Sequence, residues 1–325
     1  MKRIQQILAA VLVLQVILTA VVFWPRAAAS SEGKLFFPNL QVDDVVALNI
    51  TDNQGNQLDL RKVGDSWVLS DAGDYPAQAS AVTPVLEKLL ALDDSHLVTR
   101  TDVSHKRLQV AEDDFVRRIA FATTDGVTHT LYLGSAPQYT ATHFRLEGQD
   151  ETYLTEDLGS WDLGATASAW VDATYLNIPQ ENISEVTLEN RNGTFTFVKS
   201  DTAVESGKPP VWTLAGAASD ETPAPNKIGA LINRITELNL IQPLGKTADP
   251  TYGMADPQAV VTLQTNDGTV TLTVGAQNPD KNYVVKASNS DYYVTVSNFS
   301  AKGMVENTRE DFMKTEPTPT PAPAQ

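Results

Sequence analysis

The longest apolar run of the chain lies at its amino terminus. Residues 7–24 form 18 consecutive uncharged positions, and twelve of them are Leu, Ile, Val or Phe. As a helix this run would be about 27 Å long, which is close to the hydrocarbon thickness of a bilayer. Lys2 and Arg3 precede it, and basic residues favour the cytoplasmic side. The pattern predicts a transmembrane signal-anchor over residues 1–26, with the amino terminus in the cytoplasm.

A cleaved signal peptide is the alternative interpretation of the same run. Ala27, Ala28 and Ala29 place small residues behind the apolar core, as a cleavage site requires. The core is longer than the usual signal-peptide core of about 7 to 15 residues, which favours an uncleaved anchor. Both interpretations put the body of the protein outside the cytoplasm. We therefore expect a single-pass protein of the cell membrane with an extracytoplasmic body.

Beyond a short linker at residues 27–34, apolar and polar residues alternate around an Asn/Gly turn in two separate places. These are residues 45–60 and residues 183–197. Alternation with a period of two around such a turn predicts a β-hairpin in both. Trp67 and Trp212 follow in short apolar runs that predict a third strand, and we expect both indole rings to pack on a sheet.

A helical stripe follows each hairpin. Apolar residues recur at i, i+3, i+4, i+7 and i+10, which is the spacing of one face of a helix. The positions match at a constant offset of 146: Val82, Val85, Leu86, Leu89 and Leu92 correspond to Ile228, Leu231, Ile232, Ile235 and Leu238. This correspondence indicates that the body contains two copies of one unit.

Further short strands follow the helix in each copy. They are predicted around residues 115–123, 131–134, 143–146 and 152–154, and again around 260–265, 272–275, 283–286 and 292–294. The expected fold class is therefore α+β. It comprises two homologous repeats, each mainly an antiparallel sheet with one amphipathic helix, after an N-terminal transmembrane helix.

These patterns also predict the domain organisation. We expect a first α+β repeat at residues 35–160, a connector at 161–178, a second α+β repeat at 179–313 and a tail at 314–325. Trp161, Trp170 and Tyr175 lie in the connector, which we expect to be ordered and packed. The tail is rich in Pro and Thr and poor in apolar groups, so we expect it to be disordered.

Charge and cysteine content narrow the possible partners. After residue 26 the chain carries 21 Lys plus Arg against 40 Asp plus Glu, a formal net charge of −19. Such a body repels nucleic-acid phosphates, so we expect no nucleic-acid partner. The sequence contains no Cys, which excludes lipid attachment through cysteine and structural disulfides. Stability must come from burial of apolar surface.

The motifs of common enzyme classes are absent from the sequence. There is no G-x-S-x-G elbow, no phosphate-binding glycine loop and no H-E-x-x-H pair. The four histidines are His96, His105, His129 and His143, and we interpret them as surface or strand-face residues, although His129 and His143 fall on neighbouring predicted strands. We therefore predict no catalytic, cofactor-binding or metal-binding residues, no cofactor, and a protein that is not an enzyme.

Acidic clusters and tyrosines are the remaining candidates for chemistry. The clusters are Asp43-Asp44, Asp93-Asp94 and Glu112-Asp113-Asp114. They could pair as acid and base across a cleft, but solvated carboxylates are the ordinary state in so acidic a body. The tyrosines that could stack on a sugar or peptide are Tyr139, Tyr252, Tyr283, Tyr292 and Tyr293. Strand alternation puts Tyr292 and Tyr293 on opposite faces.

The whole arrangement resembles a bacterial family, the domain of unknown function 4340. The residues that carry the resemblance are the segment 62–69 (KVGDSWVL), the helix after Pro76-Ala77, the segment 252–257 (YGMADP), and Val274-Gly275 with the later Tyr283 and segment 292–294 (YYV). The resemblance covers residues 40–305. The first copy departs from the Tyr-Gly pattern, since residues 108–113 read LQVAED.

The resemblance implies an accessory, membrane-anchored component beside ABC-type transport systems of the gliding-motility kind, and it brings no catalytic residue. We therefore expect a membrane-tethered extracytoplasmic binding or scaffolding module with a protein partner in an envelope or transporter complex. A hydrolase of envelope polymers that uses paired carboxylates, or a receptor for a small solute, is the alternative. Sheet edges or a cleft between the repeats would provide the contact.

Overall fold

The computed structural model describes residue 15 and residues 33–138, 141–200 and 210–314. Apart from Gln15, the predicted anchor at residues 7–24 lies outside these described residues, as do nearly all of the linker and the tail. No helix within the described parts of the chain is long and apolar enough to span a bilayer.

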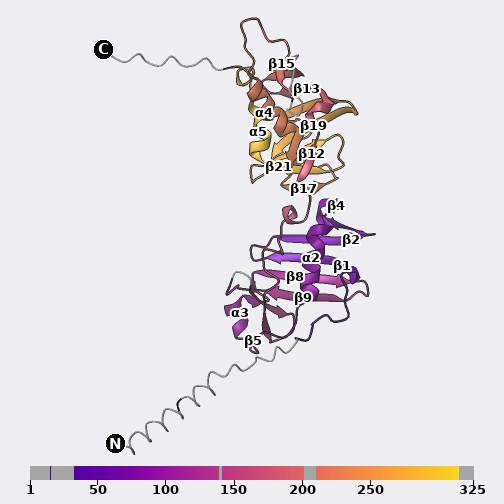
Figure 1. The fold of residues 1–325 in the computed structure, drawn as a ribbon, viewed down its shortest axis with the longest axis vertical. Helices are drawn as coiled ribbons and strands as arrows, with labels where there is room; N and C mark the ends of the chain where they lie inside the picture. Colours follow the sequence, from indigo (N-terminus) through magenta and orange to yellow (C-terminus); the bar gives the residue numbers. More distant parts are fainter. Residues whose placement is uncertain (1–14, 16–32, 139–140, 201–209, 315–325) are drawn as a thin grey trace, which may run out of the picture.

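Two antiparallel sheets form the body and lie one beyond the other along the long axis (Figure 1). The first has the strand order β4-β3-β2-β1-β8-β9-β10-β11-β5. Its strands are β1 (Val45–Asp52), β2 (Gln57–Val63), β3 (Ser66–Leu69), β4 (Tyr75–Pro76), β5 (Leu97–Thr99), β8 (Arg117–Thr123), β9 (Thr128–Leu133), β10 (Thr142–Leu146) and β11 (Thr152–Thr155).

The second sheet has the strand order β15-β14-β13-β18-β19-β20-β21-β17. Its strands are β13 (Ile183–Asn190), β14 (Gly193–Lys199), β15 (Trp212–Leu214), β17 (Gln242–Gly245), β18 (Ala259–Thr265), β19 (Gly268–Gln277), β20 (Tyr283–Ala287) and β21 (Tyr293–Val296). From β15 to β21 this order follows that of β3 to β11 in the first sheet. The predicted α+β class, dominated by antiparallel pairing, is confirmed at this level.

Four α-helices and two small strand pairs complete the described body. The helices are α2 (Ala79–Leu90), α3 (Ser104–Leu108), α4 (Pro225–Thr236) and α5 (Asn298–Glu306). The pairs are β6 (Val110–Ala111) with β7 (Asp114–Phe115), and β12 (Thr174–Asn177) with β16 (Glu237–Asn239). Short 3-10 turns include η2 (Ser70–Ala72), η3 (Ala167–Ala169) and η5 (Pro250–Tyr252).

The predicted helix stripes are the buried faces of α2 and α4. Helix α2 buries Val82, Val85, Leu86 and Leu89, and α4 buries Ile228, Leu231, Ile232 and Ile235. Each helix ends before the last predicted position, because Leu92 follows α2 and Leu238 belongs to β16, although both side chains are buried. Trp67 and Trp212 are buried as expected, at 5% and 0% exposure. One continuous apolar cluster includes residues of both sheets.

The segment between the sheets divides its contacts between them. Trp170 is buried, and its backbone carbonyl accepts a hydrogen bond from the Gln78 amide at 2.7 Å. A few residues later β12 pairs with β16, and the Leu240 amide donates to the Ala173 carbonyl at 2.8 Å. The first part of this segment is therefore bonded to the first half of the body and the second part to the second half.

Both halves share a left-handed backbone turn that the sequence does not reveal. Gly253 follows η5 with φ 68°, and Gln109 follows α3 with φ 57°. The Tyr-Gly pattern of the second half and residues 108–109 of the first half thus adopt the same local conformation. Each turn packs on a glycine: a Cβ at Gly275 would lie 2.0 Å from the Tyr252 carbonyl oxygen, and one at Gly134 would lie 2.1 Å from that of Leu108.

A basic residue also takes the same position in both sheets. Arg145 of β10 donates to the carbonyls of Leu146 and Gln149, which are one and four residues further along the chain. Lys286 of β20 donates to the carbonyls of Ala287 and Ser290, at the same spacing. The register agrees, because Phe144 pairs with Leu133 and Val285 pairs with Val274.

Candidate ligand cleft between the two halves

A cleft of about 330 Å³ opens where the two halves of the body meet. Strand β2, strand β3 and η2 form its wall on the side of the first half, residues 165–168 lie between the halves, and the start of β17 forms the opposite wall. Its lining residues are Asn56, Gln57, Leu58, Asp59, Leu69, Asp71, Ala72, Ala165, Thr166, Ala167, Ser168, Ile241, Gln242 and Pro243. Clefts of this size are the usual place for ligands to bind.

The lining combines apolar walls with acidic and amide groups. Ile241 presents exposed apolar surface, Leu58 and Leu69 lie largely buried in the wall, and Gln57 and Gln242 present side-chain amides. Among the described residues that line the cleft, only Asp59 and Asp71 carry charge. The cleft is therefore an acidic, partly apolar site that lacks a basic group of its own.

The two carboxyls are close enough to influence one another. Burial raises the pKa of the Asp71 carboxyl, and the charge of Asp59 together with a hydrogen bond between the two carboxyls raises that pKa further. The Asn49 side-chain amide donates to Asp59 Oδ1 at 2.6 Å, so Asp59 is held in place from the neighbouring strand β1. Such a pair favours a cation between or beside its members.

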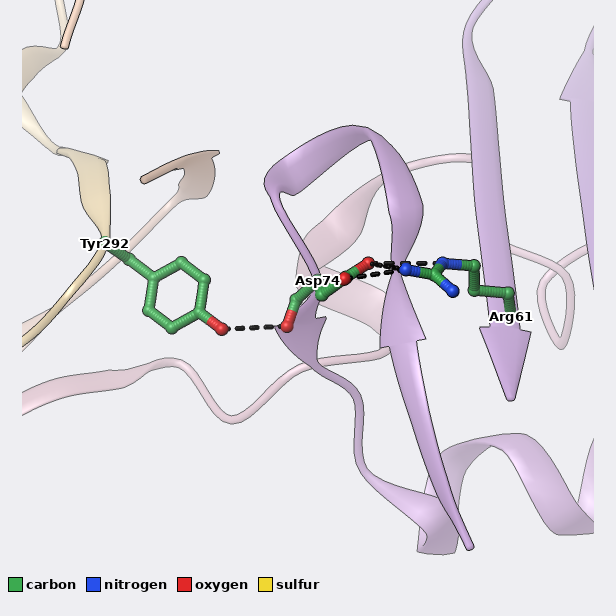
Figure 2. Close-up of polar contacts among 3 residues, drawn as sticks. All are labelled: Arg61, Asp74 and Tyr292. Atoms are coloured by element: carbon green, nitrogen blue, oxygen red, sulfur yellow. Dashed lines mark hydrogen bonds and ion pairs between the residues drawn. The ribbon is translucent and has the colours of Figure 1, made fainter. Parts of the chain in front are cut away.

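Arg61 would be the natural partner of this pair, but it is bound elsewhere. Arg61 lies two positions beyond Asp59 on β2, so both side chains project from the same face of that strand. Its guanidinium instead binds the Asp74 carboxylate, with Nη2 at 2.7 Å from both carboxylate oxygens (Figure 2). The acidic pair therefore faces the cleft without this neutralising charge.

Each of the four histidines forms a hydrogen bond or packs against neighbouring rings. His143 Nδ1 lies 2.8 Å from the Ser135 carbonyl oxygen, and His105 Nε2 lies 2.9 Å from that of Asp150, so these nitrogens are donors rather than bases. The ring of His129 packs against Phe37 and Phe121. His129 and His143 do not meet, because the β9–β10 register separates them by five residues, about 17 Å along the strands.

The remaining histidine, His96, lies beside a second and smaller cavity of about 140 Å³. Ser95 Oγ is 2.8 Å from His96 Nδ1 and is also within hydrogen-bond distance of Asp93 Oδ1. The hydroxyl has one proton, and its bond to Asp93 lowers the pKa of that carboxyl. His96 must then donate its Nδ1 proton to Ser95, so it cannot act as the base that activates this serine.

The acidic clusters singled out from the sequence do not line the cleft. Asp43 pairs with Lys62 at 3.1 Å, Asp113 pairs with Lys106 at 2.7 Å, and Asp94 accepts from the Lys34 amide at 2.8 Å. Asp59 and Asp71 were not among the candidate residues in the sequence. Their proximity depends on the β2–β3 register, which pairs Leu60 with Leu69, and no motif marks it.

This carboxyl pair does not have the geometry of a glycoside hydrolase. Such enzymes hold two carboxyls about 5 to 9.5 Å apart on either side of the scissile bond, whereas Asp59 and Asp71 share a hydrogen bond. The cleft also lacks a Trp, Tyr or Phe among its described lining residues. Within the described parts of the chain, no group of three or more His, Asp or Glu is arranged to hold a metal ion.

The candidate tyrosines serve packing or the junction between halves. Tyr139 lies outside the described residues, and Tyr283 is buried. Tyr252 packs on Tyr293, while Tyr292 turns toward the first half and packs on Tyr75 with ring centroids 4.7 Å apart. Tyr292 reaches the neighbourhood of the cleft through the turn that follows η2, and the Tyr252 hydroxyl donates to the carbonyl of Leu244, which adjoins the lining residue Pro243.

Comparison with known proteins identifies the family of the chain. The family model described as "Domain of unknown function (DUF4340)" matches residues 67–254, which include most of β3, the whole of α2 and α4, and the segment between the sheets. Neither the curated proteins nor the solved structures contain a match to the chain. The matched region covers more than half of the sequence and both walls of the cleft in part, and the chain therefore belongs to the DUF4340 family.

Proposed function

We propose that the protein is a non-catalytic binding module, tethered to the cell membrane by residues 7–24, whose cleft holds a segment of an envelope or ABC-transporter-like partner. The observation that carries this proposal is the acidic, partly apolar cleft at the junction of the two halves. A tether of this kind confines the body to the membrane surface and raises its effective concentration toward membrane partners. The body would lie on the extracytoplasmic side.

The body would consist of two homologous repeats. This part of the proposal is supported by the corresponding strand order from β3 to β11 and from β15 to β21, by the left-handed turns at Gln109 and Gly253, and by the matched bonds of Arg145 and Lys286.

The chemistry of the cleft favours a cationic ligand with apolar flanks. A lysine or arginine side chain of the partner would place its charge at Asp59 and Asp71, where no basic lining residue competes. Neighbouring apolar side chains would pack on Ile241, the exposed apolar residue of the lining, with the largely buried Leu58 and Leu69 behind the opposite wall. A small amine would satisfy the acidic pair but would leave these walls uncovered, so a peptide segment fits the cleft better than a small solute.

Binding of defined peptides to the full chain in detergent tests this function. We expect a capped tripeptide of valine, lysine and valine to bind in calorimetry, and its counterparts with central norleucine or glutamate to bind at least tenfold more weakly, since an interaction with a charged group contributes about 1.5–3 kcal/mol. Asp71→Asn should weaken binding of the lysine peptide, whereas Asp65→Asn, on the exposed β2–β3 turn, should leave it unchanged. Equal affinity for all three peptides would refute the proposal.

Binding should also depend on pH in a defined direction. The pKa of Asp71 is raised above 3.8, so the affinity for the lysine peptide should fall as the pH decreases through this raised value.

The raised pKa of Asp71 also affects stability. The folded state binds this proton more tightly than the unfolded chain, so ionisation of Asp71 opposes folding, and Asp71→Asn should increase thermal stability at pH 7. Titration of affinity against pH, with melting curves of both proteins, measures the two effects. A lower melting temperature for Asp71→Asn would contradict this assignment.

A further inference from the structure

An unusual turn follows η2 at the point where the two halves touch. Gly73 and Asp74 both adopt left-handed backbone conformations, with φ 64° and φ 62°. A non-glycine residue seldom adopts this conformation, although aspartate tolerates it better than most residues. The contacts of Asp74 show what enforces it.

Both halves of the body hold Asp74. In the first half, the Arg61 guanidinium binds the Asp74 carboxylate, and the Asp74 backbone amide donates to the Leu69 carbonyl at 3.1 Å. From the second half, the Tyr292 hydroxyl donates to the Asp74 backbone carbonyl at 2.8 Å (Figure 2). Asp74 is thus bonded through its side chain to one half and through its carbonyl to the other.

Contacts within the second half fix the position of Tyr292. The Tyr175 hydroxyl donates to the Tyr292 carbonyl at 2.8 Å and accepts from the Ala287 amide at 2.9 Å. Lys246 lies over the Tyr292 ring, 4.8 Å from its centroid. The ring therefore has a set position on the second half from which its hydroxyl meets Asp74.

These contacts adjoin both walls of the cleft. Asp71 and Ala72, which line the cleft, directly precede Gly73, and Pro243, on the opposite wall, precedes Gly245 by two residues. The two glycine backbones are in direct contact, since a Cβ at Gly73 would lie 3.1 Å from the Gly245 Cα. Any shift of one half against the other at this point would change the width of the cleft.

We infer that Asp74, Arg61 and Tyr292 form a clasp that fixes the two cleft walls relative to one another, so that these three residues are positioning residues for the ligand. The inference rests on the proposed function of the cleft, but the clasp itself is a property of the unliganded protein. A preformed cleft binds more tightly because no ordering of the walls has to accompany binding.

The test measures the distance between the halves in the full chain. Because the sequence contains no Cys, spin labels can be attached through Gln54→Cys and Asn289→Cys, which lie on exposed turns of the two halves. We expect one narrow distance distribution, a broader one for Tyr292→Phe, and about fivefold weaker binding of the lysine tripeptide by that variant, as expected for one lost hydrogen bond. Tyr292→Phe keeps the ring against Tyr75 and should fold.

Matched variants separate the clasp from general loosening. Tyr293→Phe removes a hydroxyl from the adjacent residue and should change neither the distribution nor the affinity. Asp74→Asn, which keeps a residue tolerant of the left-handed region but loses the ion pair with Arg61, should broaden the distribution between the halves. The distance distribution of a label pair within the first half, at Gln54 and Thr124, should stay narrow in every variant.

An unchanged inter-half distribution in both Tyr292→Phe and Asp74→Asn would overturn the inference. If the wild type binds no lysine peptide while Tyr292→Phe broadens the distribution, the clasp stands and the proposed function fails.

Discussion

Gly275→Ala is expected to destabilise the second half of the body by about 3 kcal/mol, at the upper end of what overpacking costs. The added Cβ would lie 2.0 Å from the Tyr252 carbonyl oxygen, which is a backbone atom and cannot rotate away. Gly253 holds that backbone in a left-handed turn, and a Cβ at Gly253 would itself lie 2.8 Å from the Ala276 amide nitrogen. Strand β19 and η5 would have to separate. Gly134→Ala should have a similar effect on the first half, because its Cβ would meet the Leu108 carbonyl oxygen at 2.1 Å.

Gly229→Ala is the matched control for this prediction. Gly229 lies inside helix α4, and a Cβ there meets no atom within 4 Å. The substitution should therefore increase stability by about 0.5–1 kcal/mol, the usual difference between glycine and alanine in a helix. Denaturant unfolding of the full chain in detergent, followed by tryptophan fluorescence, measures both changes. If Gly275→Ala were as stable as the wild type, η5 would be able to move away from β19 without loss of stability, and the prediction would be wrong.

Trp212→Ala is expected to cost about 3–5 kcal/mol, as is usual when a large aromatic is removed from a core. Trp212 is fully buried, and its indole nitrogen donates to Gln180 Oε1 at 2.9 Å. Alanine would leave a cavity under the second sheet and would also leave the buried Gln180 oxygen without this donor. Unpaired buried polar groups add their own penalty to that of the cavity.

Trp161→Ala provides the comparison, because its side chain is 52% exposed. The same chemical truncation there removes much less buried surface, so the loss of stability should be clearly smaller than for Trp212→Ala. Chemical denaturation with circular dichroism as the signal measures both variants. Trp212→Phe should recover part of the stability because the ring still fills the site. Equal losses for the two alanine variants would contradict the core position of Trp212.

Features that depend on local burial were predictable from the sequence. The hairpin alternation and the helix stripes follow directly from which residues face the core, and Val82 and Ile228 with their stripe partners are buried as expected. The two tryptophans in matching positions are likewise core residues. The short elements α3, β5 and β17 were missed, although strands of similar length, such as β10 and β21, were predicted.

Features that depend on how distant segments meet were not predictable. Asp59 and Asp71 come together through a strand register, and the cleft needs η2, residues 165–168 and β17 to meet at the junction of the halves. The separation of His129 and His143 likewise follows from register rather than from their being on adjacent strands. Tyr292 was a candidate for stacking on a ligand, but its hydroxyl bonds to Asp74 across the junction.

The pairing of β12 with β16 determines where the protein can be cut. A fragment that begins at residue 179 would lack β12, so Leu238 of β16 would lose its strand neighbour Leu176, and the Ile178 amide would no longer cap the Thr236 carbonyl. An expression fragment for the second half should therefore begin before Ala173. A fragment for the first half should extend through Trp170, whose carbonyl holds the start of α2.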